Sequence, residues 1–158
     1  MFTLFRNEDT YTKLRKVISG MQSGADQTFL AEAQRLGLET GGWAPRGFIT
    51  EAGPAPELAA KYGVKEHASY LYAPRTYQNA AEADFTVWVG ATTSPGYYCT
   101  RDACKKAGRL FLVNPTPAEF LAACRKFEVM NGAGNRASKN PAVVELVKMM
   151  MSWFEACK

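Results

Sequence analysis

The chain has 158 residues, 47% of them hydrophobic and 22% charged, which is typical of one globular domain in water. Its formal net charge of +4 comes without a dense run of Lys and Arg, so we expect no nucleic-acid partner. No stretch is long and apolar enough for a membrane span, and residues 1–10 lack the apolar core of a signal peptide, so we expect a cytoplasmic protein.

We expect a single domain over residues 1–158, in which residues 1–14 form a polar N-terminal arm. A strand follows at Val17 and Ile18, which are β-branched. The chain then turns through residues 19–24 and continues as a helix, because apolar residues recur at helical spacing on one face, at Ala25, Phe29, Ala33 and Leu36. Gly37 is a typical C-terminal stop for this helix.

The turn between this strand and helix is a candidate phosphate site. Gly20 and Gly24 permit close approach of a ligand to the main chain, and the start of the helix offers unpaired N–H groups. The motif is neither G-x-G-x-x-G nor a P-loop. The alternative is an ordinary strand-to-helix turn in which Asp26 only complements the helix dipole.

Residues 38–40 are predicted to be the end of a second strand, which continues into a second loop at residues 41–47, shaped by Gly and Pro. Its Trp43 and Arg46 suit a site that stacks a base and clamps a phosphate. Alternatively, Trp43 covers the core and Arg46 lies in solvent. Residues 48–53 are polar and carry one exposed acid, Glu51, and a helix over residues 56–62 is predicted to end at Gly63.

A third helix is predicted over residues 75–83, after a charged and aromatic connector at residues 65–72. Arg75, Thr76 and Asn79 share one face of this helix, which either contacts a ligand or is solvated. A strand at residues 85–89 leads into a loop at residues 91–96 and a helix at residues 97–107, which repeats the first strand, loop and helix. If the two loops follow neighbouring strands, they face one crevice that suits a phosphate-bearing ligand.

The last part of the chain alternates strands at residues 109–113 and 127–130 with helices at residues 117–125 and 140–157. Residues 131–138 form a third loop of small residues. Asn140 is the predicted N-cap of the final helix, which should bury one face made of Val144, Val147, Met151 and Phe154. Its Met149–Met151 run packs either in the core or against a second subunit of a homo-oligomer. The result is an α/β fold, a mainly parallel sheet of about five strands with helices on both faces.

The spacing of the cysteines and the single histidine argue against a metal site and against a catalytic triad. The four cysteines form no C-x-x-C pair and His67 is the only histidine, so we expect no protein-held metal. We expect the cysteines to pack as small apolar residues in the core of a protein from a reducing compartment. A redox role stays open for Cys99 and Cys104, which are close in the sequence. A Ser-His-Asp triad would have to use His67, which lies in a segment predicted to be exposed.

Five motifs follow one another in residues 16–156: V-I-S-G-M-Q-S-G-A-D (17–26), G-G-W-A-P-R-G (41–47), E-A-G-P (51–54), R-T-Y-Q-N (75–79) and A-G-N-R-A-S (133–138). In these motifs and their order the chain resembles the putative molybdenum carrier family, a circularly permuted YpsA-like group of the SLOG superfamily. The resemblance implies a Rossmann-like three-layer sandwich that binds nucleotide-related ligands at its strand ends. Superfamily members bind NAD-derived signals, hydrolyse nucleotides or are linked to carriage of the molybdenum cofactor.

The resemblance and the loops together give one set of predicted ligand-binding residues: Gly20, Met21, Gln22, Ser23, Gly24, Asp26, Trp43, Arg46, Gly47, Arg75, Thr76, Asn79, Ser94, Gly96, Tyr97 and Thr100. Several positions depart from the family pattern: Met21 stands for a second Gly, Ser23 for Thr, Ala44 for Cys and Ala52 for Asp. Residues 94–98 also lack the P-G-G-x-G-T-x-x-E motif of the related phosphoribohydrolases, which puts cleavage by their mechanism in doubt.

Three functions therefore remain open. The first, which we favour, is binding of a nucleotide-like molecule, such as an NAD-derived or cyclic nucleotide signal, by a carrier, sensor or sequestering protein. The second is hydrolysis of a nucleotide or N-glycosidic bond, in which Asp26 or Glu51 acts as general base or stabilises a ribosyl cation. The third is carriage of a molybdenum cofactor, with the loops holding the phosphate of its pterin.

Overall fold

The computed structural model describes residues 11–157. Residues 1–10, most of the predicted arm, lie outside the described residues. The end of the arm is part of the domain: the N–H groups of Lys13 and Leu14 donate to the Cys124 carbonyl at 2.8 and 3.1 Å, and Leu14 is buried.

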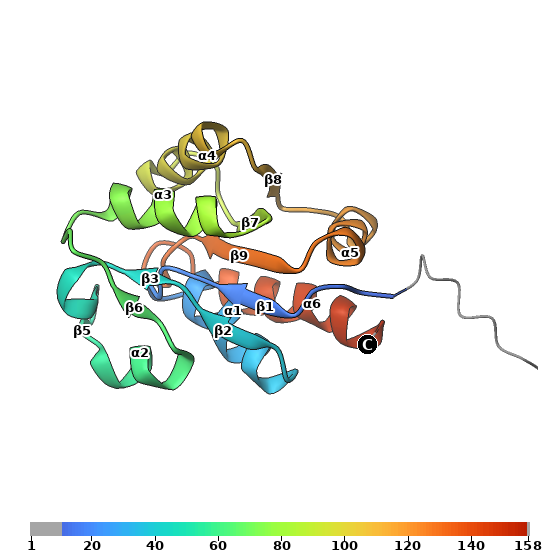
Figure 1. Ribbon diagram of the computed structural model, residues 1–158, viewed down its shortest axis with the longest axis horizontal. Helices are drawn as coiled ribbons and strands as arrows, with labels where there is room; N and C mark the ends of the chain where they lie inside the picture. Colours follow the sequence, from blue (N-terminus) through green and yellow to red (C-terminus); the bar gives the residue numbers. More distant parts are fainter. Residues whose placement is uncertain (1–10, 158) are drawn as a thin grey trace, which may run out of the picture.

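A five-stranded parallel sheet forms the centre of the molecule (Figure 1). Its strands are β1 (Lys16–Ile18), β2 (Glu39–Gly41), β7 (Phe85–Val89), β8 (Leu110–Val113) and β9 (Val129–Gly134). The order across the sheet is β2-β1-β9-β7-β8, and every neighbouring pair is parallel. The predicted fold class is confirmed.

The last strand is longer than the sequence predicts, because β9 continues through Gly132 and Gly134. A Cβ on Gly132 would overlap the ring of Phe29, and a Cβ on Gly134 would come within 2.5 Å of the Ala25 Cβ. These glycines are therefore strand residues that let the first helix pack closely on β9. The third loop begins only after Gly134, which corrects the loop predicted to start at residue 131.

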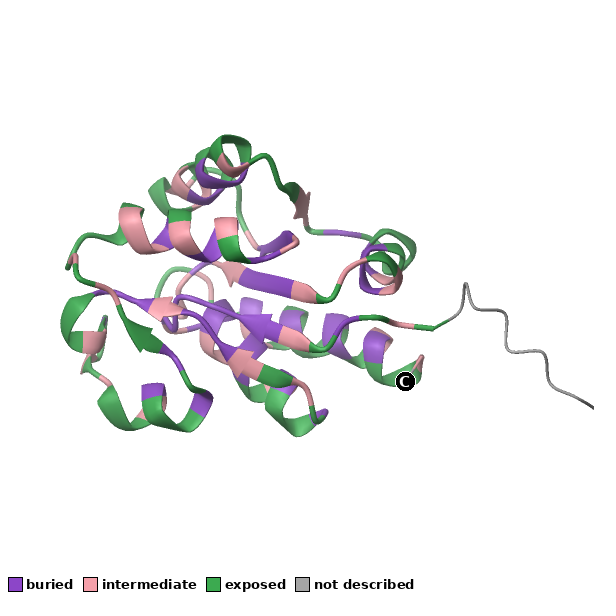
Figure 2. Ribbon diagram, in the orientation of Figure 1, coloured by how far each residue is buried: buried purple, intermediate pink, exposed green. Residues whose placement is uncertain are grey.

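Helices cover both faces of the sheet (Figure 1). On one face, α1 (Ala25–Arg35), α5 (Pro117–Lys126) and α6 (Val143–Ala156) enclose the largest apolar cluster with Val17, Phe85, Val87 and Met130. On the other face, α3 (Tyr72–Glu82) and α4 (Pro95–Ala107) pack around a small cluster of Ala80, Ala103 and Cys104. The sheet lies in the buried layer between them (Figure 2). In α1, all four residues of the predicted apolar face are buried.

Three helix starts differ from the predictions. The last helix begins at Val143, because Asn140 donates its side-chain amide to Asn135 Oδ1 at 3.2 Å instead of capping the helix. As a result Val143 is fully buried and Val144 only half-buried. The helix α3 begins at Tyr72, with Pro74 in its first turn, and α4 begins at Pro95.

The segment between β2 and α3 builds a separate lobe. It contains the short strands β3 (Trp43–Ala44) and β6 (Lys65–Glu66), which pair in parallel, and the hairpin of β4 (Ile49–Thr50) with β5 (Gly53–Pro54). The sequence analysis did not predict these strands. The segment also contains a 3-10 turn at residues 46–48.

The lobe is held by its own apolar cluster, made of Met21, Leu30, Ala44, Ala59, Tyr62 and Val64. The predicted helix is present as α2 (Pro56–Tyr62) and ends at Gly63 in the left-handed conformation. Within residues 11–157, no helix is long and apolar enough to cross a membrane.

The order of the strands creates a binding crevice at the carboxyl edge of the sheet. From β1 the chain moves to β2 in one direction, and from β7 it moves to β8 in the other. Open α/β sheets bind ligands outside the strand ends at such a reversal. Because β9 lies between β1 and β7, the two predicted loops follow strands that are not neighbours, and the loop after β9 lies between them.

Candidate ligand-binding site

A crevice of about 950 Å³ opens where β1, β9 and β7 end. Its lining comes from the turn after β1 with the start of α1, from the start of α3, from β7 with the loop and the start of α4 that follow it, and from the end of β9 with its following loop. The lining residues with polar or aromatic side chains are Gln22, Asp26, Tyr72, Arg75, Thr76, Trp88, Thr93, Ser94, Cys99, Thr100, Asn135, Arg136, Lys139 and Asn140. The volume suits a small organic molecule, whose binding sites typically measure about 300–1,000 Å³.

Asp26 places one carboxyl group in the buried part of the crevice. Its side chain is only 6% exposed, and Oδ2 accepts the backbone N–H of Gln22 at 3.2 Å. Burial raises the pKa of Asp26 from 3.8 to about 6, although Arg75, the Gln22 N–H, Arg136 and Ser19 all act to lower it. The carboxyl group is therefore mostly ionised at neutral pH and protonated a little below it.

The guanidinium of Arg75 packs on Gly20 and interacts electrostatically with Asp26. A Cβ at residue 20 would overlap this guanidinium and lie 3.2 Å from Asp26 Oδ2. Glycine is thus required at this position for the approach of Arg75 to the turn. The Arg75 carbon Cζ lies 5.3 Å from the ring centroid of Tyr72, and Cζ of Arg136 lies 4.8 Å from the same centroid.

The charge of the crevice is predominantly positive. Its lining contains three cationic side chains, Arg75, Arg136 and Lys139, and one carboxyl group, that of Asp26. Arg75 is held close to the acid, whereas Lys139 is exposed. Such a set attracts an anion, and guanidinium groups bind carboxylates and phosphates through paired hydrogen bonds.

The start of α4 adds the positive end of a helix dipole. Ser94 caps the helix by accepting the Tyr97 N–H at 3.1 Å, and Thr100 donates to the Gly96 carbonyl at 2.9 Å. The N–H of Gly96 has no acceptor among residues 11–157. The start of α4 therefore offers a ligand one free main-chain donor, the Gly96 N–H.

The turn after β1 contributes fewer free donors than the sequence predicts. The Gln22 N–H is bonded to Asp26, the Ala25 N–H to the Asn135 carbonyl at 3.2 Å, and the Gln27 N–H to the Gln22 carbonyl at 3.1 Å. These three N–H groups already donate to acceptors within the protein, so they are not free to bind a ligand. The turn consequently presents side chains to the crevice, chiefly those of Gln22 and Asp26.

Seven of the predicted ligand-binding residues come together in the crevice: Gln22, Asp26, Arg75, Thr76, Ser94, Gly96 and Thr100. Gly20 lies directly behind Arg75. Two walls of this crevice therefore belong to the repeated strand, loop and helix.

Other predicted ligand-binding residues of the first turn and of α4 have different surroundings. Met21 has a positive φ of 64° and is fully buried in the cluster of the lobe. Gly24 also has a positive φ, and a Cβ there would lie 2.5 Å from the Ala137 nitrogen. Ser23 bonds to Glu51, and the ring of Tyr97 packs against Trp88 at a centroid distance of 5.5 Å.

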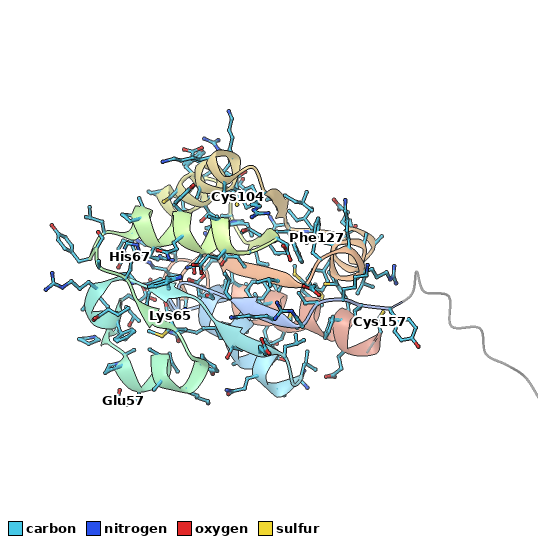
Figure 3. All side chains as sticks on the ribbon, in the orientation of Figure 1. Glu57, Lys65, His67, Cys104, Phe127 and Cys157 are labelled. Atoms are coloured by element: carbon cyan, nitrogen blue, oxygen red, sulfur yellow. The ribbon has the colours of Figure 1, made fainter. Side chains whose placement is uncertain are left out.

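The second predicted loop lies in the lobe, outside the crevice lining. Trp43 donates its indole N–H to Glu82 at 2.8 Å, and its backbone N–H and carbonyl both bond to the side chain of Asn79, at 2.9 and 3.0 Å. Lys65 lies over the indole, and the ring of His67, labelled with Lys65 in Figure 3, meets its edge. Arg46 is exposed, and Gly47 donates its N–H to Glu66.

Glu51, the second catalytic candidate, links three segments outside the crevice. Its carboxylate accepts hydrogen bonds from the hydroxyl groups of Ser23 and Ser138 and from the Ser138 N–H. The Ser138 and Ser23 hydroxyl groups lower the pKa of Glu51, so it is an anion at neutral pH. Glu51 thereby fastens the β4–β5 hairpin to the turn after β1 and to the loop that carries Arg136.

The loop after β9 supplies crevice residues to which the sequence analysis assigned no role. Asn135 is buried, and its Oδ1 accepts the Ala91 N–H at 2.6 Å, which joins this loop to the one before α4. Arg136 and Lys139 bring two of the three cations. In the sequence, the motif A-G-N-R-A-S at residues 133–138 pointed to Asn135 and Arg136. No pattern in the sequence indicated that Tyr72, Cys99 and Lys139 would line the crevice.

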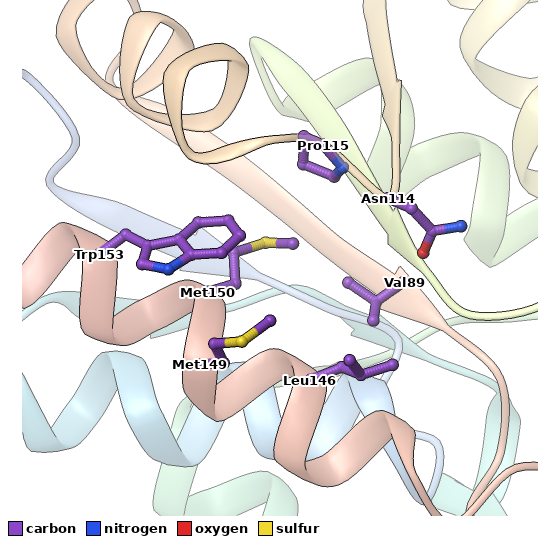
Figure 4. Close-up of a pocket in the computed structure, with 7 residues that line it drawn as sticks. All are labelled: Val89, Asn114, Pro115, Leu146, Met149, Met150 and Trp153. Carbon is purple, nitrogen blue, oxygen red and sulfur yellow. The ribbon is translucent and has the colours of Figure 1, made fainter.

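A second, smaller hollow of about 160 Å³ lies on the other face of the sheet (Figure 4). Apolar residues of α6, including Leu146, Met149 and Trp153, line it together with Val89 and Pro115. Its single polar lining residue, Asn114, is bonded to both the N–H and the carbonyl of Gly90. The polar chemistry is therefore gathered in the large crevice.

Metal-ligating side chains do not converge in the part of the chain that the structure describes. In residues 11–157, no three side chains of His, Cys, Asp or Glu are placed to hold one metal ion. All four cysteines are free thiols. Cys104 and Cys124 are buried, and burial raises the pKa of both, that of Cys124 to about 12. Cys99 lines the crevice.

Comparison with known proteins gives two matches. The model of the circularly permutated YpsA SLOG family matches residues 17–154. The chain is also similar to the crystal structure of a protein from Syntrophus aciditrophicus SB whose name is putative molybdenum carrier protein. The two are 25% identical, with a TM-score of 0.79 over 90% of this chain and 96% of the other. No curated protein matches the chain significantly.

Proposed function

The chain belongs to the circularly permutated YpsA SLOG family, and we propose that it binds a phosphate-bearing, nucleotide-like small molecule in this crevice. The observation that carries the proposal is the meeting of three cations, one buried carboxyl group and the start of α4 in one crevice. In this proposal the protein acts in the cytoplasm as a carrier, sensor or sequestering protein.

The charges of the crevice match a phosphate monoester. Arg75, Arg136 and Lys139 exceed the ionised Asp26 by two positive charges (three minus one). A phosphate monoester carries about −1.5 to −2 at neutral pH. Its oxygens accept several hydrogen bonds at once, which suits two guanidinium groups and the free N–H of Gly96.

The size of the crevice favours an organic molecule over a bare anion. A volume of about 950 Å³ far exceeds what inorganic phosphate fills. Polar side chains line the crevice at both ends, from Asp26 to Thr100. A ligand with a phosphate at one point and a polar ring at another uses all of these groups.

Hydrolysis remains a second candidate function because of Asp26. A buried carboxyl group with a pKa of about 6 is suited to exchange protons at neutral pH. Glu51 is distant from this chemistry, since its oxygens are bonded to Ser23 and Ser138 outside the lining. The single carboxyl group is the reason we place binding before hydrolysis. Recovery of a cleaved product would reverse that order.

The name of the Syntrophus relative raises a third candidate, carriage of a molybdenum cofactor. The crevice fits the phosphate of such a cofactor through Arg75, Arg136 and Lys139. The described residues offer the metal only one thiol in the crevice, that of Cys99, so the cofactor itself would have to supply the other molybdenum ligands. Bound to the protein, the cofactor would be cargo, with its phosphate end held by these cations.

Isothermal titration of the purified protein with nucleoside monophosphates tests the proposal. We expect one site per chain, weakened about tenfold or more in Arg136→Gln, because this variant removes a cation from the crevice. Arg46→Gln is the matched control: it removes the same charge from an exposed site outside the lining. Equal affinity of both variants, or no binding by the parent protein, would contradict the proposal.

A further inference from the structure

Two buried polar atoms of the crevice lining have no hydrogen-bond partner among residues 11–157: Oε1 of Gln22 and Nε of Arg75. Gln22 is only 4% exposed, and its other amide atom, Nε2, is fixed by the Ile49 carbonyl at 3.0 Å. This bond leaves Oε1 as the free end of the amide. A buried acceptor and a buried donor are thus left unpaired beside the carboxyl group of Asp26.

Such atoms require an explanation, because nearly all buried polar groups in folded proteins are paired. Leaving them unpaired destabilises the free protein, whereas a ligand that pairs with them restores the lost hydrogen bonds. Two main-chain donors of the turn are paired within the protein, since the Gln22 N–H is bonded to Asp26 and the Met21 N–H to Ser19. A third buried side-chain atom without a partner among residues 11–157, Nε of Arg125, belongs to α5 and lies outside the crevice lining.

The hydrogen-bonding pattern of these groups selects a ring edge. Oε1 of Gln22 and the carboxylate of Asp26 are acceptors, and Nε of Arg75 is a donor. The matching ligand edge carries two donors and one acceptor. An amino group, a ring N–H and a carbonyl in a row provide this, as in the 2-amino-4-oxopyrimidine ring that guanine and pterins share. The pairing edges of adenine, cytosine and uracil each carry only one donor group.

We propose that Gln22, Asp26 and Arg75 recognise the 2-amino-4-oxopyrimidine edge of the ligand, so that the crevice prefers a guanine or pterin monophosphate. This inference rests on the proposed function and names the ligand class of the same site. The ring edge enters the buried part of the lining. Nε of Arg75 is assigned to the ring edge, while the charge of its guanidinium still adds to that of Arg136 and Lys139 around the phosphate. The phosphate itself lies toward Arg136, Lys139 and the start of α4, which are more exposed than Gln22 and Asp26.

Titration calorimetry with GMP and IMP isolates the edge, because the two nucleotides differ only in the 2-amino group. We expect GMP to bind about ten- to hundredfold more tightly than IMP, with AMP and UMP weaker still. Neopterin monophosphate and its 2-oxo analogue repeat the comparison on a pterin. A preference for the amino compound in either pair supports the inference and identifies the ring source.

Two variants test the assignment of residues. Asp26→Asn and Gln22→Met each remove an acceptor, so the ratio of GMP to IMP affinity should fall toward one. Asp102→Asn is the matched control, because Asp102 is an exposed acid that pairs with Arg101 on α4. Thermal unfolding verifies that each variant is folded. A GMP preference that persists in both crevice variants would overturn the assignment.

The titrations separate the failure of this inference from that of the proposed function. Equal binding within both the GMP–IMP pair and the neopterin pair, or a preference for AMP or UMP, would overturn ring-edge recognition and leave phosphate binding intact. Absence of binding by all nucleotides and pterins would overturn both.

Discussion

The crevice and the lobe present the same kinds of side chain but differ in how those side chains are paired. Trp43 in the lobe has its indole N–H bonded to Glu82 and both of its backbone groups bonded to Asn79, while Arg46 lies in solvent. In the crevice, Arg75 has a buried nitrogen that finds no hydrogen-bond partner within residues 11–157, and it lies close to a buried carboxyl group. An aromatic residue and an arginine therefore indicate a binding site only where their polar atoms remain both buried and unsatisfied.

The largest expected effect separates the two arginines. Arg75→Met should weaken binding of a monophosphate ligand about hundredfold, because it removes the guanidinium nearest the buried acid. Arg46→Met should change affinity less than twofold, since Arg46 is exposed in the lobe. Calorimetric titration of both variants measures the difference. Similar losses in the two variants would remove the distinction between crevice and lobe.

Asp26→Asn should increase stability while it weakens binding. Since burial raises the folded-state pKa of Asp26 from 3.8 to about 6, the folded protein holds this proton more tightly than the unfolded chain. Stability should therefore fall as the pH rises from about 4 to about 6 and stay level above that.

Asparagine at position 26 remains neutral. Above pH 7 the variant should therefore be more stable than the parent by about 1–3 kcal/mol. The groups that face Asp26 are the guanidiniums of Arg75 and Arg136, the Gln22 N–H and Ser19. Urea unfolding at pH 4 and pH 7.5 tests the prediction: the difference between variant and parent should appear only at the higher pH. An equal difference at both pH values would contradict it.

A variant of Asn79 tests whether the residues on the predicted polar face of α3 have different roles, with Arg75 and Thr76 lining the crevice and Asn79 holding Trp43. Its buried side chain bonds the backbone N–H and carbonyl of Trp43, so Asn79→Ala should lower the free energy of unfolding by about 1–3 kcal/mol. The affinity of the folded variant for a monophosphate should stay unchanged. Urea unfolding and calorimetry on the same sample give both values. A large loss of affinity with unchanged stability would assign Asn79 to the ligand instead.

The smallest expected effect is that of Glu51→Gln. Glu51 lies outside the crevice but fastens the loop of Arg136 through Ser138, so the variant should weaken ligand binding by less than about threefold. Because hydrogen bonds lower the pKa of Glu51, its contribution is present near neutral pH and is lost on acidification. A loss as large as that of Arg75→Met would return Glu51 to the catalytic candidates.

Local sequence patterns located the elements of the fold but not their order in the sheet. The β-branched and apolar runs gave five strands, and the spacing of Ala25, Phe29, Ala33 and Leu36 gave the buried face of α1. The position of β9 between β1 and β7 depends on pairing between distant segments, which periodicity does not report. Gly132 and Gly134 were interpreted as loop residues because their contact with α1 is a tertiary one.

The candidate site divides in the same way. Repeated strand-loop-helix units pointed to the turn after β1 and to the start of α4, both of which line the crevice. The approach of Arg75 across Gly20 and the burial that raises the pKa of Asp26 arise from packing between α3 and the turn. Trp43 does not line the crevice, because its backbone N–H is bonded to Asn79 and its indole N–H to Glu82. These tertiary bonds are not visible in the local sequence pattern.

The most direct test of the account is native mass spectrometry of the protein after incubation with a small-molecule extract of cells. The parent protein should carry one phosphate-bearing, ring-containing molecule per chain, released intact on denaturation, and Arg75→Met should carry none. A parent protein that acquires no adduct, or an Arg75→Met protein that acquires the same adduct, would contradict the assignment of the crevice as the binding site.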